Sequence, residues 1–314
     1  MNDRKKTISV LIPCYNESEN IEPLHKALSE VTDKENAYQW EFLFVDDGSS
    51  DDTLQTIKKL SQKDSRIAFV SLSRNFGKEN AMLAGFDNVS GDCVITMDAD
   101  LQHSPDIIPQ MLRHWEEGFD DVYAKRKNRD NESLIRRSLT ELYYKMLQRM
   151  AKIDILPNVG DFRLLDRKCI DALRQLRETQ RYTKALYCWI GYRKKAVEFE
   201  TNTRTLGKST FGYAKLFNLA IEGITSYTTA PLRISTVTGL IASMSAFLYM
   251  SFVLLKTLIV GEPVPGYPTI IILILFLGGL QLLSIGIIGE YLARIFHETK
   301  NRPVYLIKEM SKKQ

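Results

Sequence analysis

Short runs of apolar and β-branched residues alternate with stretches of helical spacing over the first 125 residues of the chain. The runs are apolar at nearly every position, which is typical of strands that helices cover on both faces of a sheet. This alternation predicts βαβ units on a mostly parallel sheet. The expected strands are 8–12, 42–45, 67–70 and 94–97. A helix is expected to begin after Ser104, because serine is a good N-cap and Pro105 suits the first helical position.

The pattern is mixed after residue 131. A helix is expected near 132–151, and strands are expected at 162–165 and 196–199. The stretch Tyr213–Tyr227 gathers apolar residues on one side and has Lys215 beside them. Because it lies just before a strongly apolar region, we expect a helix on the bilayer surface rather than a core helix.

Two long apolar stretches follow, at 234–260 and 269–289. Each is long enough to cross a bilayer as a helix, and the proline-rich link between them breaks a helix. A transmembrane hairpin is therefore predicted. Basic residues flank both ends of the hairpin and the link has none, so the positive-inside rule places the first domain and both termini in the cytoplasm.

These patterns divide the 314 residues into four parts. They are an α/β domain (1–205), an amphipathic juxtamembrane segment (206–232), a membrane hairpin (233–292) and a cytosolic tail (293–314). The net charge of +4 is too balanced to indicate a nucleic-acid partner. The first apolar run is too short for a signal peptide, and the four cysteines lack zinc spacing, so we expect free thiols in a reducing compartment.

Three polar clusters each follow a predicted strand, at 13–17, 46–49 and 98–102. Because the carboxyl ends of parallel strands meet at one edge, we expect the clusters to share one crevice. Asp98 and Asp100 suit a hard divalent cation such as Mg²⁺ or Mn²⁺, and Gln102 could add a carbonyl oxygen. The alternative is an ordinary Asx-rich turn. A dinucleotide site is not expected, because the chain lacks G-x-G-x-x-G.

The three clusters, in this order and together with the block Leu72–Lys78 and the hairpin, resemble the family-2 glycosyltransferases of GT-A fold. Within them the chain is most similar to the bacterial polyprenyl-phosphate glycosyltransferases, which include bactoprenol glucosyltransferases, and to dolichyl-phosphate mannose synthase. The resemblance covers about residues 7–305. It implies a Rossmann-like GT-A domain that transfers one hexose from a nucleotide sugar to undecaprenyl phosphate, with a metal ion and with inversion.

The resemblance also implies roles for individual residues. The nucleotide-sugar site would contain Pro13, Tyr15, Glu17, Asp47 and Asp98, and the metal ligands would be Asp98, Asp100 and Gln102. The catalytic group would be Asp98, Asp161 and Arg163. Arg126 and Arg136 or Arg137 match basic positions associated with phosphate, and Arg204 and Lys208 are further candidates to hold the acceptor phosphate near the bilayer.

Asp161 matches the acidic residue proposed as the general base. A polyprenyl phosphate has a second pKa of about 6, as other phosphate monoesters do, so it is largely dianionic at pH 7 and needs little deprotonation. Asp161 then has a second candidate role, which is to orient the acceptor or a sugar hydroxyl, or to position Arg163. Both roles stay open at this point.

UDP-glucose is the first choice of donor, UDP-N-acetylglucosamine the second and GDP-mannose the third. A processive enzyme with a polysaccharide acceptor is a rival, but the chain lacks the Q-x-x-R-W motif. A nucleotide-sugar-binding membrane adaptor without turnover is another, and the intact Asp98, Asp100 and Asp161 argue against it. The lipid bilayer is an expected partner, and a homo-oligomer assembled through the hairpin is a further expectation.

Overall fold

The computed structural model describes residues 4–126, 159–179, 181–199, 230–260 and 266–311. The described residues divide into two compact units. The first unit holds the residues before 200 together with 303–311. The second holds two long helices, α9 (Ala230–Val260) and α10 (Tyr267–Thr299).

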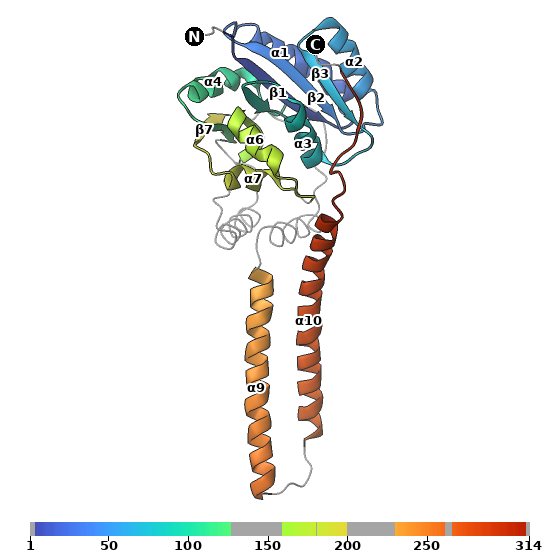
Figure 1. The fold of residues 1–314 in the computed structure, drawn as a ribbon, viewed down its shortest axis with the longest axis vertical. Coiled ribbons are helices and arrows are strands. Elements are labelled where there is room, and N and C mark those ends of the chain that lie inside the picture. The colour runs from blue at the N-terminus through green and yellow to red at the C-terminus, as the bar shows by residue number, and fades with distance from the viewer. Residues whose placement is uncertain (1–3, 127–158, 180, 200–229, 261–265, 312–314) are drawn as a thin grey trace. The chain divides into compact units, whose positions relative to one another are not determined.

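An eight-stranded sheet forms the centre of the first unit, in the order β7-β5-β6-β4-β1-β2-β3-β8 (Figure 1). Its strands are β1 (Thr7–Cys14), β2 (Gln39–Asp46), β3 (Ile67–Leu72), β4 (Cys93–Thr96), β5 (Asp121–Arg126), β6 (Val159–Asp166), β7 (Lys194–Phe199) and β8 (Ile307–Met310). Strands β1 to β4 are parallel to one another, as are β5 and β7, while β6 and β8 run antiparallel to their neighbours. The predicted α/β fold with a mostly parallel sheet is confirmed.

All six strands expected from the sequence are present, because each expected run lies within or overlaps β1, β2, β3, β4, β6 or β7. The described residues of the first unit contain the helices α1 (Ser18–Thr32), α2 (Thr53–Lys63), α3 (Lys78–Asn88), α4 (Ile108–Glu116), α6 (Arg167–Gln175) and α7 (Thr183–Trp189). Apolar side chains of α1, α2 and α4 form one core with alternate residues of β1 and β2. Helix α3 packs on β1 from the other face, where Gly85 lies so close to Leu11 that a Cβ would meet its side chain.

The helix expected after Ser104 begins where the sequence predicts. The Ser104 hydroxyl accepts a hydrogen bond from the Asp106 N–H at 3.4 Å, as an N-cap does. One turn of 3₁₀ helix, η1 (Pro105–Ile107), then continues directly into α4.

Strand β8 was not expected from the sequence. It pairs antiparallel with β3 and covers what would otherwise be the open edge of the sheet. A four-residue strand with two charged residues carries too short a pattern to be recognised by periodicity.

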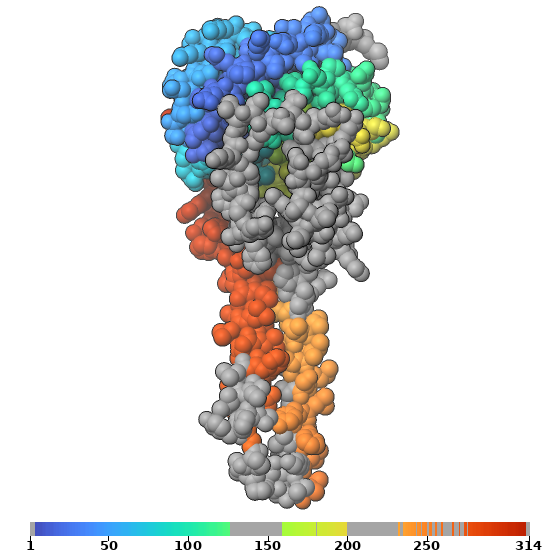
Figure 2. Space-filling model, turned by 180° about the vertical axis from the view of Figure 1, so that it is seen from behind, coloured from blue at the N-terminus to red at the C-terminus, as the bar shows by residue number. Residues whose placement is uncertain are grey.

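Helices α9 and α10 pack side by side in the second unit, where Figure 2 shows them in orange and red. At 1.5 Å per residue each is roughly 45–50 Å long. Within the part of the chain that the structure describes, one segment, Phe276–Thr299, has the length and the mean hydropathy expected for crossing a membrane. It overlaps the second predicted span, whereas Ser235–Tyr249 of α9 is a shorter apolar stretch. The helices predicted at 132–151 and 213–227 lie outside the described residues.

Candidate active site

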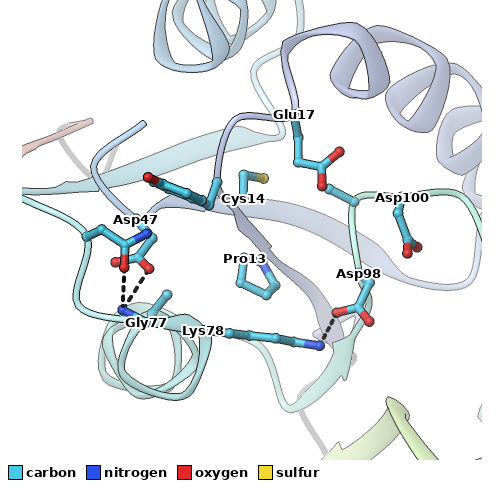
Figure 3. A pocket seen from close by; sticks show the side chains of 12 residues that line it. Pro13, Cys14, Glu17, Asp47, Gly77, Lys78, Asp98 and Asp100 are labelled. Carbon is cyan, nitrogen blue, oxygen red and sulfur yellow. Dashed lines mark hydrogen bonds and ion pairs between the residues drawn. The ribbon is translucent and has the colours of Figure 1, made fainter. Parts of the chain in front are cut away.

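A cavity of about 310 Å³ opens at the carboxyl ends of the parallel strands (Figure 3). Residues from all three polar clusters line it, and the loop after β3 and the first turns of α3 complete it. The lining residues are Pro13, Cys14, Tyr15, Glu17, Asp47, Asn75, Gly77, Lys78, Ala81, Asp98, Ala99 and Asp100. The structure therefore brings together, in one crevice, every residue that the resemblance assigns to the nucleotide sugar.

Asp47 stabilises one wall of the cavity through hydrogen bonds to the backbone. Its carboxylate accepts hydrogen bonds from the N–H groups of Phe76 at 2.7 Å and Gly77 at 2.9 Å. Burial raises the pKa of Asp47, and these two hydrogen bonds offset part of the rise. These two hydrogen bonds join the segment after β2 to the loop after β3.

Gly48 lets the same two segments approach each other closely. It has a φ of +66°, and a Cβ there would stand 2.4 Å from the carbonyl carbon of Arg74. Only glycine satisfies both conditions without strain. The neighbouring Asp46 accepts a hydrogen bond from the Ser71 hydroxyl at 2.7 Å, which joins the end of β2 to β3 a second time.

Asp98, Asp100 and His103 form a group that fits a divalent cation. One ligand atom from each lies within 4.8 Å of the others. The two carboxylates suit Mn²⁺ or Mg²⁺, and the imidazole offers a third ligand atom. His103 is 4% exposed, and its ring packs against those of Phe162 and Phe199.

His103 was not selected from the sequence, although it directly follows the cluster 98–102. The backbone turns sharply in this cluster: Leu101 has a φ of +57°, which is rare for a large side chain. Gln102 donates its N–H to Asp100 Oδ1 at 3.2 Å. Strain of this kind is found where a site holds its side chains in a fixed direction.

Lys78 is the second residue that the sequence did not single out. Its ammonium lies 2.6 Å from Asp98 Oδ1 and 2.7 Å from Asp161 Oδ2, and Figure 3 shows the first contact. Burial alone would lower the pKa of Lys78, but the two carboxylates outweigh it and raise that pKa above its usual value. The Lys78 ammonium thus contacts both Asp98, a proposed donor-site residue, and Asp161, a proposed catalytic residue.

Asp161 lies on β6 and is 9% exposed. Burial alone would raise its pKa, but the positive charges of Lys78 and Lys184 outweigh burial and lower the pKa of Asp161 below its usual value. Asp161 is therefore held as a carboxylate.

Arg163 lies in the interior and not on the cavity wall. It is 2% exposed, forms an ion pair with Asp121 at 2.9 Å and places its guanidinium 3.7 Å from the centre of the Tyr187 ring. Because Arg163 and Asp161 are two residues apart on β6, their side chains share one face of the sheet. The positive charge of Arg163 adds a smaller contribution to the lowered pKa of Asp161.

The predicted acceptor-phosphate group is not located by the structure. The backbone of Arg126 ends β5, and its side chain lies outside the described residues. Arg136, Arg137, Arg204 and Lys208 also lie outside them.

The four cysteines are free, as the sequence predicts. Cys14 lines the cavity, and burial raises its pKa well above the usual value, so it remains a neutral thiol.

Residues 9–174 match the family model described as glycosyl transferase family 2. The chain belongs to this family. The resemblance stated above is confirmed, and the protein is a glycosyltransferase.

The chain is 46% identical over 302 residues to a putative glycosyltransferase, CsbB, of Bacillus subtilis (strain 168). The alignment covers 96% of this chain and 91% of the relative. It is 41% identical over 302 residues to the SfII prophage-derived bactoprenol glucosyl transferase of Shigella flexneri, covering 96% and 97%. A solved structure of glucosyl-3-phosphoglycerate synthase from Mycobacterium tuberculosis with Mn²⁺, UDP-glucose and phosphoglyceric acid is 19% identical, with a TM-score of 0.49 over 70% of this chain and 78% of that one.

Proposed function

We propose that this glycosyltransferase moves one glucose from UDP-glucose to undecaprenyl phosphate at the cytoplasmic face of a membrane, with inversion. The observation that carries the proposal is the single cavity in which Asp47, Asp98, Asp100 and Lys78 meet at the sheet edge. The identity to a bactoprenol glucosyl transferase supports glucose as the sugar and a polyprenyl phosphate as the acceptor. UDP-N-acetylglucosamine is the second candidate donor.

The donor nucleotide is assigned to the wall formed by Asp47 and by the segment after β1. Pro13, Tyr15 and Glu17 line that side of the cavity, and the half-exposed ring of Tyr15 offers a surface for a base. The buried Asp47 carboxylate fixes the shape of the wall, so its contribution is to hold the nucleoside pocket open at the right width.

The diphosphate end is assigned to Asp98, Asp100 and His103, with Gln102 as a further ligand. The donor set fits Mg²⁺ or Mn²⁺, because its atoms lie within 4.8 Å of one another and two of them are carboxylate oxygens. When bound there, the ion supplies Lewis-acid neutralisation of the charge on the leaving diphosphate. The protein's own part is to hold these side chains in place.

Asp161 is proposed to orient the reacting groups rather than to accept a proton. Its lowered pKa makes it a weak base, and the acceptor phosphate is already largely dianionic at pH 7. Catalysis then depends on keeping the acceptor phosphate, the sugar carbon and the leaving group in line. Arg163 acts as a positioning residue behind Asp161.

Residues 206–232 are proposed to lie on the bilayer, and α9 and α10 are proposed to form the transmembrane hairpin, with both termini cytoplasmic. This arrangement suits an acceptor whose phosphate lies at the interface while its tail stays in lipid. Arg126, Arg136, Arg137, Arg204 and Lys208 are proposed to hold that phosphate. Self-association through the hairpin is part of the same proposal.

The test uses the full-length protein in detergent with undecaprenyl phosphate, Mg²⁺ or Mn²⁺, and a panel of UDP- and GDP-sugars. Lipid products are followed by mass spectrometry. Asp100→Ala is the inactive variant, and Asp106→Ala, an exposed carboxylate six residues on, is the matched control.

One glycosylated lipid, lost only in Asp100→Ala, supports the proposal and identifies the sugar. Metal-dependent nucleotide-sugar binding without any lipid product contradicts it. That result favours either an adaptor without turnover or an enzyme with a polysaccharide acceptor. Repeating the assay with glycan fragments in place of the lipid distinguishes the two, because only the enzyme would form a product.

A further inference from the structure

The last described segment of the chain, Pro303–Ser311, packs on the catalytic unit; we name it the strap. It begins shortly after α10 ends at Thr299, yet it belongs to the first compact unit. Figure 1 shows its strand β8 running along the outer edge of the sheet beside β3. The strap is therefore the covalent link from the second unit back to the catalytic unit.

The strap extends its pairing with β3 to Ser73, directly before residues 74–77, which we name the donor loop. Beyond the paired residues of β8 and β3, the N–H of Ser73 donates to the carbonyl of Leu306 at 2.8 Å. Ser73 comes directly before the loop whose Phe76 and Gly77 N–H groups bind Asp47. The strap thus fixes one end of the loop, and Asp47 fixes the other.

The strap also holds α3, the helix that carries Lys78 into the cavity. The Tyr305 hydroxyl donates to Asp87 Oδ2 at 2.6 Å, and Arg177 binds the same carboxylate at 2.7 and 2.9 Å. Asp87 lies in the last turn of α3, where a negative charge is unfavourable unless it has such partners. Tyr305 is partly buried, so its hydroxyl is directed at this contact rather than at solvent.

We propose that the strap is a positioning element for the donor site, with Tyr305 as its principal positioning residue. It holds β3 through Leu306 and α3 through Tyr305; the cavity-lining residues Asn75 and Gly77 lie between these two elements, and Lys78 begins α3. Loosening it moves the wall on which the nucleoside diphosphate rests. The inference rests on the proposed donor site and adds to it a link from the end of α10.

The test compares Tyr305→Phe with Glu309→Gln in the full-length protein. Tyr305→Phe removes one polar contact of the strap, and Glu309→Gln removes the charge from another, in which Glu309 binds Lys58 of α2, away from the donor loop. Tyr305→Phe is expected to raise the KM for UDP-glucose three- to tenfold at unchanged kcat and to weaken UDP binding, measured by calorimetry, by the same factor. Asp87→Asn, which alters the same contact from the other side, is expected to do likewise.

Glu309→Gln is expected to leave the KM and the UDP affinity as in the wild type. The proposal is overturned if Tyr305→Phe lowers thermal stability without weakening UDP binding, or if both variants weaken binding equally. Because UDP binding needs no turnover, the calorimetric comparison stands even when no lipid product forms, so failure of the proposed function and failure of the strap remain distinguishable.

Discussion

Replacing Gly48 by alanine tests how the donor site is built. The residue has a φ of +66°, where a non-glycine residue costs about 1–2 kcal/mol. The new Cβ would also stand 2.4 Å from the Arg74 carbonyl carbon, and carbon atoms pack at about 3.5 Å. The Arg74 backbone must therefore withdraw by about 1 Å.

That displacement acts directly on Asp47. Its hydrogen bonds from Phe76 and Gly77, at 2.7 and 2.9 Å, come from the segment that must move. Hydrogen bonds to charged groups contribute about 1.5–3 kcal/mol each. Weakening one such bond by half costs about 0.8–1.5 kcal/mol. If UDP binding must restore that bond, UDP affinity falls by about three- to twelvefold.

Gly118→Ala is the matched control. Gly118 also has a positive φ, +91°, but a Cβ there would meet nothing within 4 Å, and the residue lies in the turn between α4 and β5. Both variants should lose stability in urea unfolding, which the three tryptophans report, since all lie in the catalytic unit. Only Gly48→Ala should lose UDP affinity by calorimetry. Equal UDP affinity of the two variants would refute the reasoning.

Three further predictions follow from charged contacts. Lys78→Met removes the cation that two site carboxylates share and should lower kcat at least tenfold in the lipid-product assay; a kcat within twofold of wild type would contradict this role. Arg163→Met leaves Asp121 buried without its ion-pair partner and should cost about 3–5 kcal/mol in urea unfolding, most of it recovered when Asp121→Leu is added. Burial alone would raise the pKa of Asp64, but hydrogen bonds from Arg66 outweigh it and lower that pKa, so the stability lost in Asp64→Asn should be largest near pH 7 and shrink as the pH falls below about 4. A loss that is constant with pH would count against that assignment.

Six of the eight described strands and the shared crevice could be predicted because both follow from local pattern and from the geometry of parallel sheets. Apolar runs such as 8–12 mark buried strands, and polar residues at their carboxyl ends must meet. The role of Lys78 could not be predicted in this way. Its partner Asp161 lies 83 residues away on β6, and only the fold brings them together. Strand β8 could not be predicted because a four-residue strand with two charged residues carries too short a pattern, and its pairing with β3 is seen only in the fold.

The placement of Lys78 also explains how several carboxylates coexist in one site. Asp98 and Asp161 both contact the Lys78 ammonium, at 2.6 and 2.7 Å, so their carboxylates lie close enough to repel one another. A shared ammonium between Asp98 and Asp161 removes much of that repulsion, and the pKa of Asp161 is lowered rather than raised. Figure 3 shows the carboxylate of Asp100 apart from the Lys78–Asp98 pair. Lys78 thus offsets the charge of Asp161 and of one oxygen of Asp98, and the proposed cation would be held by Asp98 together with Asp100 and His103.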